Sequence, residues 1–426
     1  MNTLFLIWKT KSLRWKIGAV LLLLLATRVL INIPIPGINV TGLQTLFQGN
    51  QFLNLLDIFS GGGLTNFSIA MLGVGPYITA SIIMQLLTMI VPSLKELQKE
   101  SGEAGRAKIN QYTRFLTIPL AVISGFGTIR LIQSQGGAEI LGVFSPFQWF
   151  LTLLCVTAGT LLIMWIGEII TEYGIGNGIS LIIFAGIVAQ LPTSLRSLVE
   201  LYDPTKLPMI LAFTAAIILV IAGVVLVTEA QRNVPVSYAK RMRGDRQVGG
   251  VDSHLPLRLN QAGVIPIIFA LSLMMFPAIV AQFFVNAKTA AIANFAQSAI
   301  DFTNNQGLYY GIVYFVLVVA FTYFYTNIVI NPDDVAQNMQ RSGGFIPGLR
   351  PGAQTAGYLY KVLNRITLPG SLFLGLIAVL PFIVQQWTGT QSLTLGGTGL
   401  LIVVSVVIES IKQIEAQLTM HDYQGY

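Results

Sequence analysis

Ten stretches of roughly twenty mostly apolar residues run through the chain, and no other feature restricts its fold as strongly. An α-helix needs about 20 such residues to cross the hydrocarbon core of a bilayer. A lone strand at that depth would leave its backbone groups without hydrogen-bond partners, so these stretches are predicted to be helices. They lie near residues 17–34, 72–91, 113–132, 147–170, 177–195, 208–228, 262–285, 308–330, 364–386 and 397–418. The pattern predicts an all-α, multi-pass membrane protein with ten transmembrane helices.

Composition supports lipid as the surrounding solvent. Charged residues make up 10% of the 426 residues, whereas soluble domains carry about 25%. A chain of this length with so few charges cannot cover itself with a water-facing surface. The missing polar surface therefore agrees with ten spans in a membrane.

The distribution of basic residues predicts the orientation. With the N-terminus in the cytoplasm, 20 of the 25 Lys and Arg residues fall in segments that face the cytoplasm. Cytoplasmic loops of membrane proteins carry this excess, and a wrong number of spans would scatter it. We therefore expect both termini to be cytoplasmic.

The segment between the first two spans differs from an ordinary connection. Residues 52–59 are apolar but too short to cross a bilayer, and Ser-Gly-Gly-Gly at 60–63 interrupts them. Irregular backbone at membrane depth is tolerated only inside protein or beside a water-filled cavity. The segment therefore predicts a cavity, with a helix lying on the outer membrane surface as the alternative.

Two other features exceed what a simple helix bundle needs. Glycines cluster where two spans begin, at 174–178 and 396–399, which permits either close helix packing or a loosened helix start. The cytoplasmic connections at about 229–260 and 331–363 are long and expose arginines at turns. Arginine suits acidic protein surfaces and phosphate groups, although the orientation rule alone would also make these loops basic.

The side chains needed for catalysis or metal binding are scarce. The chain has one cysteine, Cys155, and two distant histidines, His254 and His421. It contains none of the common zinc, nucleophile or phosphate-loop motifs. We therefore expect no enzyme activity, no cofactor and no metal site, which argues against a membrane enzyme.

A secondary transporter for a small solute is the main alternative, because broken helices occur there too. Such proteins usually place ionisable groups at the membrane midplane, and the midplanes of the predicted spans are almost free of them. Saturable solute uptake by liposomes that hold this chain alone would favour the transporter.

Seven segments together resemble the SecY family of protein-translocation channels, and the match covers nearly the whole length. Their order and spacing are specific, although each alone is weak. The segments are 33–38, 73–87, 174–180, 238–241, 262–266, 341–352 and 396–398.

The resemblance implies two inverted five-helix halves, residues 1–200 and 201–426, around a central hourglass pore. It implies a plug helix at about 53–66 and a lateral gate formed by spans two and three against spans seven and eight. The implied function is the central subunit of a protein translocation channel. Such a channel passes unfolded secretory polypeptides across the membrane and releases hydrophobic segments sideways into lipid.

Four groups of site residues follow from the resemblance. The pore ring maps onto Ile78, Ile82, Ile179, Ile183, Ile268 and Ile402. The plug maps onto Asn54, Leu55, Asp57, Ile58, Phe59, Gly61 and Gly62. A polar cluster at the gate maps onto Gln85, Asn177 and Thr398. Docking of partners maps onto Lys240, Arg241, Arg243, Arg246 and Arg350.

The partners implied by the resemblance are the small membrane subunits SecE and SecG, the motor ATPase SecA, the ribosome, signal peptides and nascent chains, and membrane lipids. The implied location is the plasma membrane, with a thylakoid as the alternative. Two departures from the family pattern stand out. The loop at 100–108 has Ala104 and Ala107 where charges are expected, and Gly399 stands where serine or alanine is expected.

Overall fold

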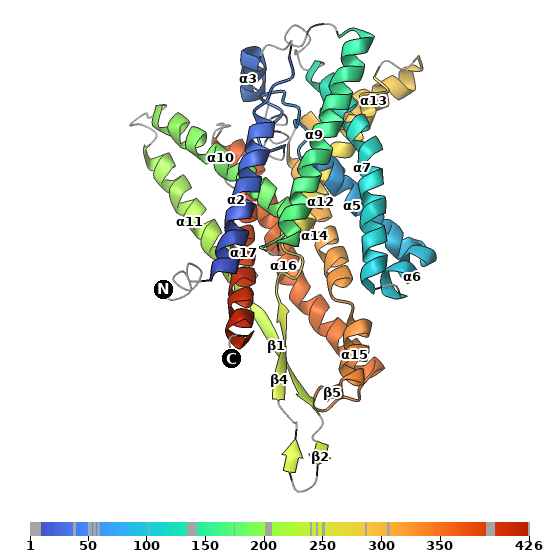
Figure 1. Cartoon of the computed structure of the whole chain (residues 1–426). Coiled ribbons are helices and arrows are strands. Elements are labelled where there is room, and N and C mark those ends of the chain that lie inside the picture. Colours follow the sequence, from blue (N-terminus) through green and yellow to red (C-terminus); the bar gives the residue numbers. More distant parts are fainter. Residues whose placement is uncertain are drawn as a thin grey trace.

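The fold is a bundle of long helices with a small β-structure projecting from one end (Figure 1). The computed structural model describes residues 10–36, 40–49, 53, 57, 60–100, 102–133, 142, 144–173, 175–200, 207–238, 241–243, 246–248, 252–285, 288–304, 307–388 and 397–424.

Ten helices overlap the ten predicted spans one by one, so the predicted helical, multi-pass fold is confirmed. They are α2 (Lys11–Ile31), α5 (Gly75–Ile90), α7 (Gly102–Ile132), α9 (Pro146–Glu172), α10 (Gly178–Glu200), α11 (Leu207–Glu229), α12 (Ile265–Ala281), α14 (Leu308–Val329), α16 (Ala353–Thr388) and α17 (Gly397–Gln424). Among the described residues, 4 helices are long and apolar enough to cross a membrane, and four more are apolar but shorter.

Several helices extend beyond the apolar stretches that predicted them. α7 begins at Gly102 rather than near 113, and α16 spans Ala353–Thr388 rather than 364–386. Hydropathy marks the part of a helix that lipid can surround. The helix itself continues through polar residues such as Lys, Gln and Glu, because these are good helix formers.

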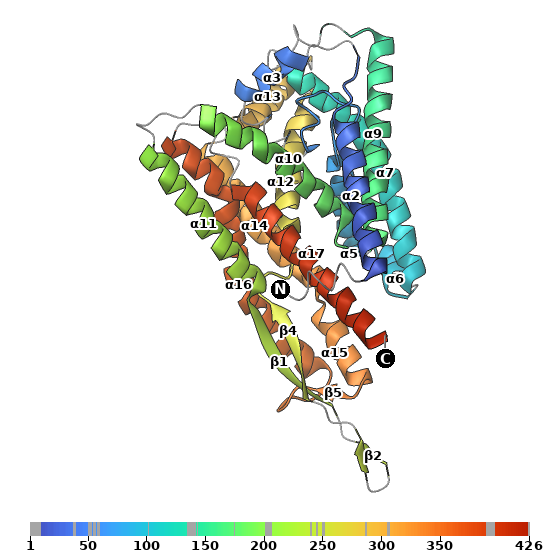
Figure 2. The same cartoon turned by 60° about the vertical axis from the view of Figure 1, so that its left-hand side comes forward.

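Four shorter helices lie at the ends of the bundle: α3 (Val40–Gly49), α6 (Pro92–Glu100), α13 (Ala290–Asn304) and α15 (Pro332–Arg341). α3 and α13 lie at one end, while α15 and the strands lie at the other (Figures 1 and 2). α15 has a well-defined start, because the Asn331 side chain accepts a hydrogen bond from the Asp333 backbone N–H and Pro332 occupies the first turn.

The two long loops form a β-structure that the sequence analysis missed. Strand β1 (Gln231–Tyr238) pairs with β4 (Asp252–Arg258) and with β5 (Gly344–Phe345), in the order β4-β1-β5. Strands β2 (Arg241–Arg243) and β3 (Arg246–Val248) form a separate hairpin. Val234 and Val236 alternate with exposed neighbours and pack on the N-terminal part of α16. Because β1 pairs with strands from both loops, the two loops form one unit.

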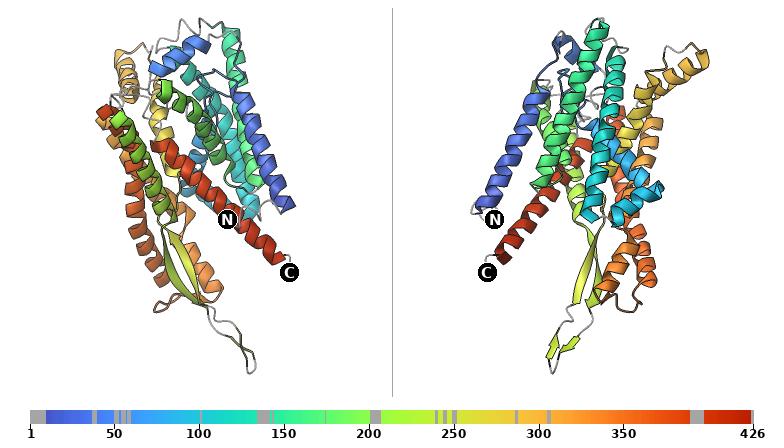
Figure 3. Two further views of the ribbon diagram at one scale, coloured as in Figure 1. Left: turned by 90° about the vertical axis from the view of Figure 1, so that its left-hand side faces the viewer. Right: turned by 45° about the vertical axis from the view of Figure 1, so that its right-hand side comes forward.

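The helices form two groups that meet in the middle of the molecule (Figure 3). α5, α7, α9 and α10 pack against one another in sequence, and α12, α14 and α16 do likewise. Contacts between the groups join α10 to α17, and α12 to both α5 and α7. The main hydrophobic core includes residues from both groups, so the interior between them is where a site can form.

Candidate pore and plug

The six isoleucines predicted to form the pore ring come from four helices of both groups. Ile78 and Ile82 lie on α5, and Ile179 and Ile183 lie on α10; the other two lie on α12 and α17. Five of the six belong to one buried hydrophobic cluster, and the partly buried Ile179 packs against it. Ile402 is 1% exposed and Ile268 is 5% exposed. The structure therefore gathers these residues in the centre of the bundle.

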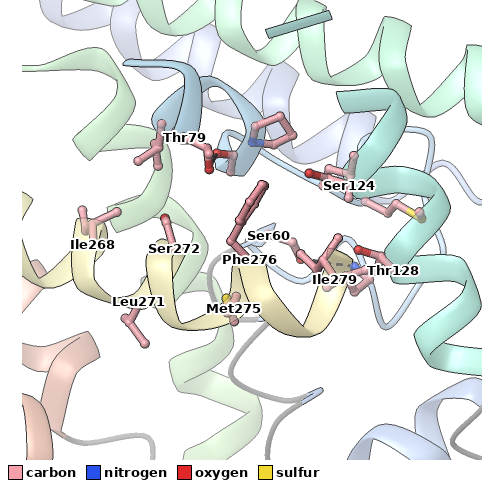
Figure 4. Close-up of a pocket in the computed structure, with 16 residues that line it drawn as sticks. Ser60, Thr79, Ser124, Thr128, Ile268, Leu271, Ser272, Met275, Phe276 and Ile279 are labelled. Carbon is pink, nitrogen blue, oxygen red and sulfur yellow. Dashed lines mark hydrogen bonds between the residues drawn. The ribbon is translucent and has the colours of Figure 1, made fainter. Parts of the chain in front are cut away.

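A cavity borders this cluster on each side. The larger cavity, about 500 Å³, is lined by Ile78, Ile179, Ile183 and Ile268 together with polar side chains. The smaller, about 90 Å³, is also lined by Ile78 and Ile268, and by Ser60 of the plug segment (Figure 4). Ile78 and Ile268 are therefore the predicted ring residues that the two cavities share.

Not every predicted ring residue lies on a cavity wall. Ile82 and Ile402 are buried in the same cluster but line neither of these two cavities. Val74, which the sequence analysis did not name, is 1% exposed and belongs to the same cluster. It lies one helical turn before Ile78 at the start of α5. That i−4 spacing was the signal in the sequence that could have found it.

The larger cavity has a polar wall. Arg114 of α7 forms an ion pair with Glu168 of α9, with Nε and Oε1 2.8 Å apart. Both residues line the cavity, as do Gln85 and Asn177. The pair could not be found in the sequence, since residues 54 positions apart show no signal of contact.

Two members of the predicted polar cluster meet at this wall. Gln85 Nε2 lies 3.4 Å from Ser81 Oγ, and its Oε1 atom is buried without a hydrogen-bond partner in the described part of the chain. Asn177 Oδ1 accepts hydrogen bonds from the backbone N–H groups of Ile179 and Ser180, at 3.1 and 3.4 Å, and so caps α10. Thr398 lies in the first turn of α17, but its side chain is outside the described part.

The glycines that precede α10 permit a close helix approach. A Cβ at Gly178 would overlap the backbone of Gly167 on α9, and the Gly178 N–H donates to the Thr171 hydroxyl at 2.9 Å. Gly176 has φ +112°, a conformation that favours glycine. The motif therefore fixes the position of the Asn177 cap beside the cavity.

The plug segment is less helical than predicted. Leu53, Asp57 and Ser60 are helical, but residues 61–74 form turns, so the predicted helix to 66 is wrong beyond Ser60. The glycines end it, because Gly61 and Gly62 have φ of 76° and 92°. Four plug residues lie outside the described part of the chain: Asn54, Leu55, Ile58 and Phe59.

Asp57 organises the turn that follows it. Its Oδ1 atom accepts a hydrogen bond from the Thr65 backbone N–H at 2.8 Å and lies 3.4 Å from Ser60 Oγ. Its Oδ2 atom lies 3.5 Å from Nε2 of Gln190 on α10. Burial raises the pKa of Asp57, and the hydrogen bonds from Thr65, Leu64 and Ser60 oppose that rise.

The predicted docking residues lie on the β-structure and beside it. Arg350 is exposed and follows β5, and its backbone is fixed by Gln354 and Thr355. Arg241 and Arg243 lie on β2 and Arg246 on β3, at the end of the ribbon away from the helices (Figure 2). The side chains of these three, and Lys240 entirely, lie outside what the structure describes.

Comparisons with known proteins agree on one family. The SecY family model matches residues 68–411. The protein translocase subunit SecY of Streptomyces galbus is 44% identical over 434 residues, which cover 98% of each chain. That of Mycobacterium tuberculosis (strain CDC 1551 / Oshkosh) is 43% identical over 437 residues, again 98% of each chain.

Solved structures share the fold. A protein-conducting channel matches with a TM-score of 0.61 at 20% identity, and canine Sec61 in a ribosome-channel complex with 0.58 at 19% identity. Each match covers 94% of this chain and 91% of the chain in the solved structure. The small-solute transporter is not supported by any of these likenesses. The chain belongs to the SecY family, and it is a membrane channel that translocates proteins.

Proposed function

We propose that the two cavities and the isoleucine cluster are the funnels and waist of an hourglass pore for unfolded polypeptides. Residues 1–200 and 201–426 would form the two halves around it. The observation that carries the proposal is that Ile78 and Ile268 border both cavities. Bulky apolar side chains make a dry constriction that stops water and ions. They form no directional bonds, so many different sequences can pass.

The ring then consists of the six predicted isoleucines, with Ile78, Ile179, Ile183 and Ile268 at the cavity walls and Ile82 and Ile402 supporting them. Val74 is the further candidate on α5, because it is almost fully buried one turn from Ile78.

The lateral gate would open where α5 and α7 meet α12, with α14 behind it. At this boundary the rings of Phe126 and Phe283 stack with centroids 4.8 Å apart. A Cβ at Gly127 would lie 3.0 Å from the Ile279 carbonyl oxygen. Burial of each CH₂ group of a passing hydrophobic helix is worth about 0.8 kcal/mol. A signal sequence could therefore offset an opening cost of a few kcal/mol.

The polar cluster would bias the gate toward closure. Gln85 and Asn177 face one cavity, and the Asn177 cap on α10 stabilises this arrangement. The Gln85 carbonyl oxygen has no hydrogen-bond partner among the described residues, a cost that a rearrangement of the cluster would relieve. We infer that a bound signal sequence rearranges this cluster, with Thr398 as its third member.

Partners would supply the driving force. The exposed Arg350 and the hairpin that carries Arg241, Arg243 and Arg246 suit acidic surfaces, as would Lys240 between β1 and β2. We propose the SecA motor and the ribosome as their partners; one similar structure is that of a ribosome-channel complex. SecE and SecG would flank the helices within the lipid. Signal peptides and nascent chains would be the cargo.

The proposed location is the plasma membrane, with both termini in the cytoplasm. α2 begins and α17 ends toward the side where the β-structure projects (Figure 1). That side carries most of the basic residues, as cytoplasmic faces do.

The test is photocrosslinking. A photoreactive residue at Ile183, on a cavity wall, should crosslink to a polypeptide stalled during translocation. The matched control is the same residue at Ile218 of α11, which is 62% exposed on the outside of the bundle. Equal crosslinking from the two positions would contradict the pore.

A further inference from the structure

Arg28 is a charged residue inside the first membrane span, and its position requires a reason. It lies in α2 between apolar neighbours and is half-buried. Charged side chains are costly at membrane depth and usually mark a functional contact. Its Nη1 atom donates a hydrogen bond to the Gly61 carbonyl oxygen of the plug segment at 2.6 Å. The first span therefore holds the plug directly.

Gly186 of α10 completes the place where the plug rests. A Cβ at Gly186 would lie 2.9 Å from Gly61 Cα and 3.4 Å from Arg28 Nη2. A Cβ at Gly61 would in turn lie 3.5 Å from Gly186 Cα and 3.4 Å from the Ile31 side chain. Gly61 thus fits into a notch between α2 and α10 that has no room for a side chain at position 186.

The plug contributes a charge of its own to the same place. Gln190, one turn beyond Gly186 on α10, lies 3.5 Å from the Asp57 carboxylate. Three separate segments therefore meet here: the first span, the fifth span and the plug.

The hydrogen bond from Arg28 to Gly61 uses only one of the two terminal nitrogens of the guanidinium group. Arg28 Nη2 is buried, and no described residue accepts a hydrogen bond from it. A buried donor without a partner costs free energy. If the plug moved away, water could accept a hydrogen bond from this atom and remove that cost. This cost opposes the contact, so the contact can break when the plug moves.

We propose that Arg28 is the latch of the plug: its guanidinium group holds the Gly61 carbonyl in the notch beside Gly186 while the channel is closed, and this contact breaks when the channel opens. The inference rests on the proposed pore, and it assigns Arg28 as a positioning residue that acts through the plug.

The first experiment compares Arg28→Gln, Arg28→Lys and Arg14→Gln in planar bilayers, with the full chain and its partner subunits. Arg14 is exposed at the cytoplasmic end of the same helix, so its loss controls for removing a charge from α2. Arg28→Gln should raise the resting open probability about tenfold or more. Arg28→Lys can still donate to one carbonyl and should restore much of the closure. Arg14→Gln should behave as the parent channel.

A second variant reaches the same contact without touching the arginine. Gly186→Ala should push Gly61 out of the notch and raise the open probability. Gly18→Ala on α2 is the control, because a Cβ there meets nothing within 4 Å. If both variants act on one latch, combining Arg28→Gln with Gly186→Ala should add little to either alone.

Two failures can be told apart. If Arg28→Gln and Gly186→Ala conduct no more than the parent while Ile268→Gly leaks, the latch is wrong and the pore stands. If the parent channel moves no polypeptide in the same membranes, the proposed function itself is wrong. Should Arg28→Gln fail to fold, Gly186→Ala and Arg28→Lys decide the question in the same assay.

Discussion

Isoleucine suits the waist of this channel for reasons that belong to its side chain. It is apolar and bulky, so several of them together exclude water. Its branch at Cβ restricts χ1, so the side chain keeps its position with little rotamer freedom. Ile78 and Ile268 are almost fully buried, yet both border the two cavities.

Removing the side chain of Ile268 should open a water path through the resting channel. We expect Ile268→Gly to raise ion flux from proteoliposomes several-fold, because the two cavities that it separates would join. Ile377→Gly is the matched control. Ile377 is 4% exposed in the same cluster but lies on α16 and lines neither cavity. Similar flux from both variants would mean that loosened packing, rather than the waist, causes the leak.

The sequence could predict that these isoleucines share helix faces, but not which face points into the pore. Ile78 and Ile82 are spaced i, i+4, as are Ile179 and Ile183, so each pair lies on one side of its helix. The structure places Ile78 at both cavities and Ile82 at neither. That distinction depends on the height of each residue along α5 relative to α12, which is set by contacts between helices. The repeat of apolar residues along a single helix carries no information about such contacts.

At the scale of elements, the plug depends on a carboxyl group that titrates. Burial raises the pKa of Asp57 in the closed arrangement. If the plug moves and Asp57 reaches water, its pKa returns toward the ordinary value. The closed state therefore binds the proton more tightly than the open state. The stabilisation of closure is complete below the ordinary pKa and is lost as the pH rises through the raised pKa.

The resting open probability should accordingly fall as the pH on the plug side is lowered from about 8 to about 4. Single-channel recording at stepped pH measures this. In Asp57→Asn the dependence should disappear, because the amide does not titrate. Asp301→Asn on α13, an exposed position, should keep it. A pH dependence that survives in Asp57→Asn would assign the effect to another group.

The β-structure shows what a search for spans cannot find. Its strands are short, and Pro235 and Pro256 lie within β1 and β4, where proline is normally disfavoured. The signal that existed was the alternation of buried Val234 and Val236 with exposed neighbours. The pairing of β1 with β5 joins residues more than 100 positions apart. It follows from tertiary contact, so the two loops could not be recognised as one unit from the sequence.

Arg350 stands beside this unit with its backbone fixed and its side chain exposed. Arg350→Glu should reduce partner-driven export of a secretory protein about tenfold or more, because a like charge placed against an acidic surface costs several kcal/mol. Arg341→Glu makes the same change of charge at an exposed position in the same connection. It should retain at least half of the export. Equal losses would point to net charge rather than to a docking residue.

For the whole molecule, the number and order of spans followed from hydropathy because lipid leaves few alternatives to a helix. The way in which the helices pack together could not be predicted from hydropathy. α12 contacts both α5 and α7 of the other group, and the sequence contains no periodic signal for that contact. The resemblance to the SecY family indicated which helices would form the gate. The structure shows which residues lie where those helices meet.

Those residues allow a direct test of whether the two groups must separate. A Cβ at Gly127 would lie 3.5 Å from Ile279 Cα, so cysteines at the two positions would lie close enough to be joined by oxidation. With Cys155 replaced by serine, Gly127→Cys with Ile279→Cys should stop translocation when oxidised and restore it when reduced. Gly125→Cys with Val156→Cys is the control, because it joins α7 to α9 within one group. That link should leave translocation unchanged, since α7 and α9 move together if the gate opens at α12. Full translocation with the bond across α7 and α12 intact would show that polypeptides pass without the halves parting there.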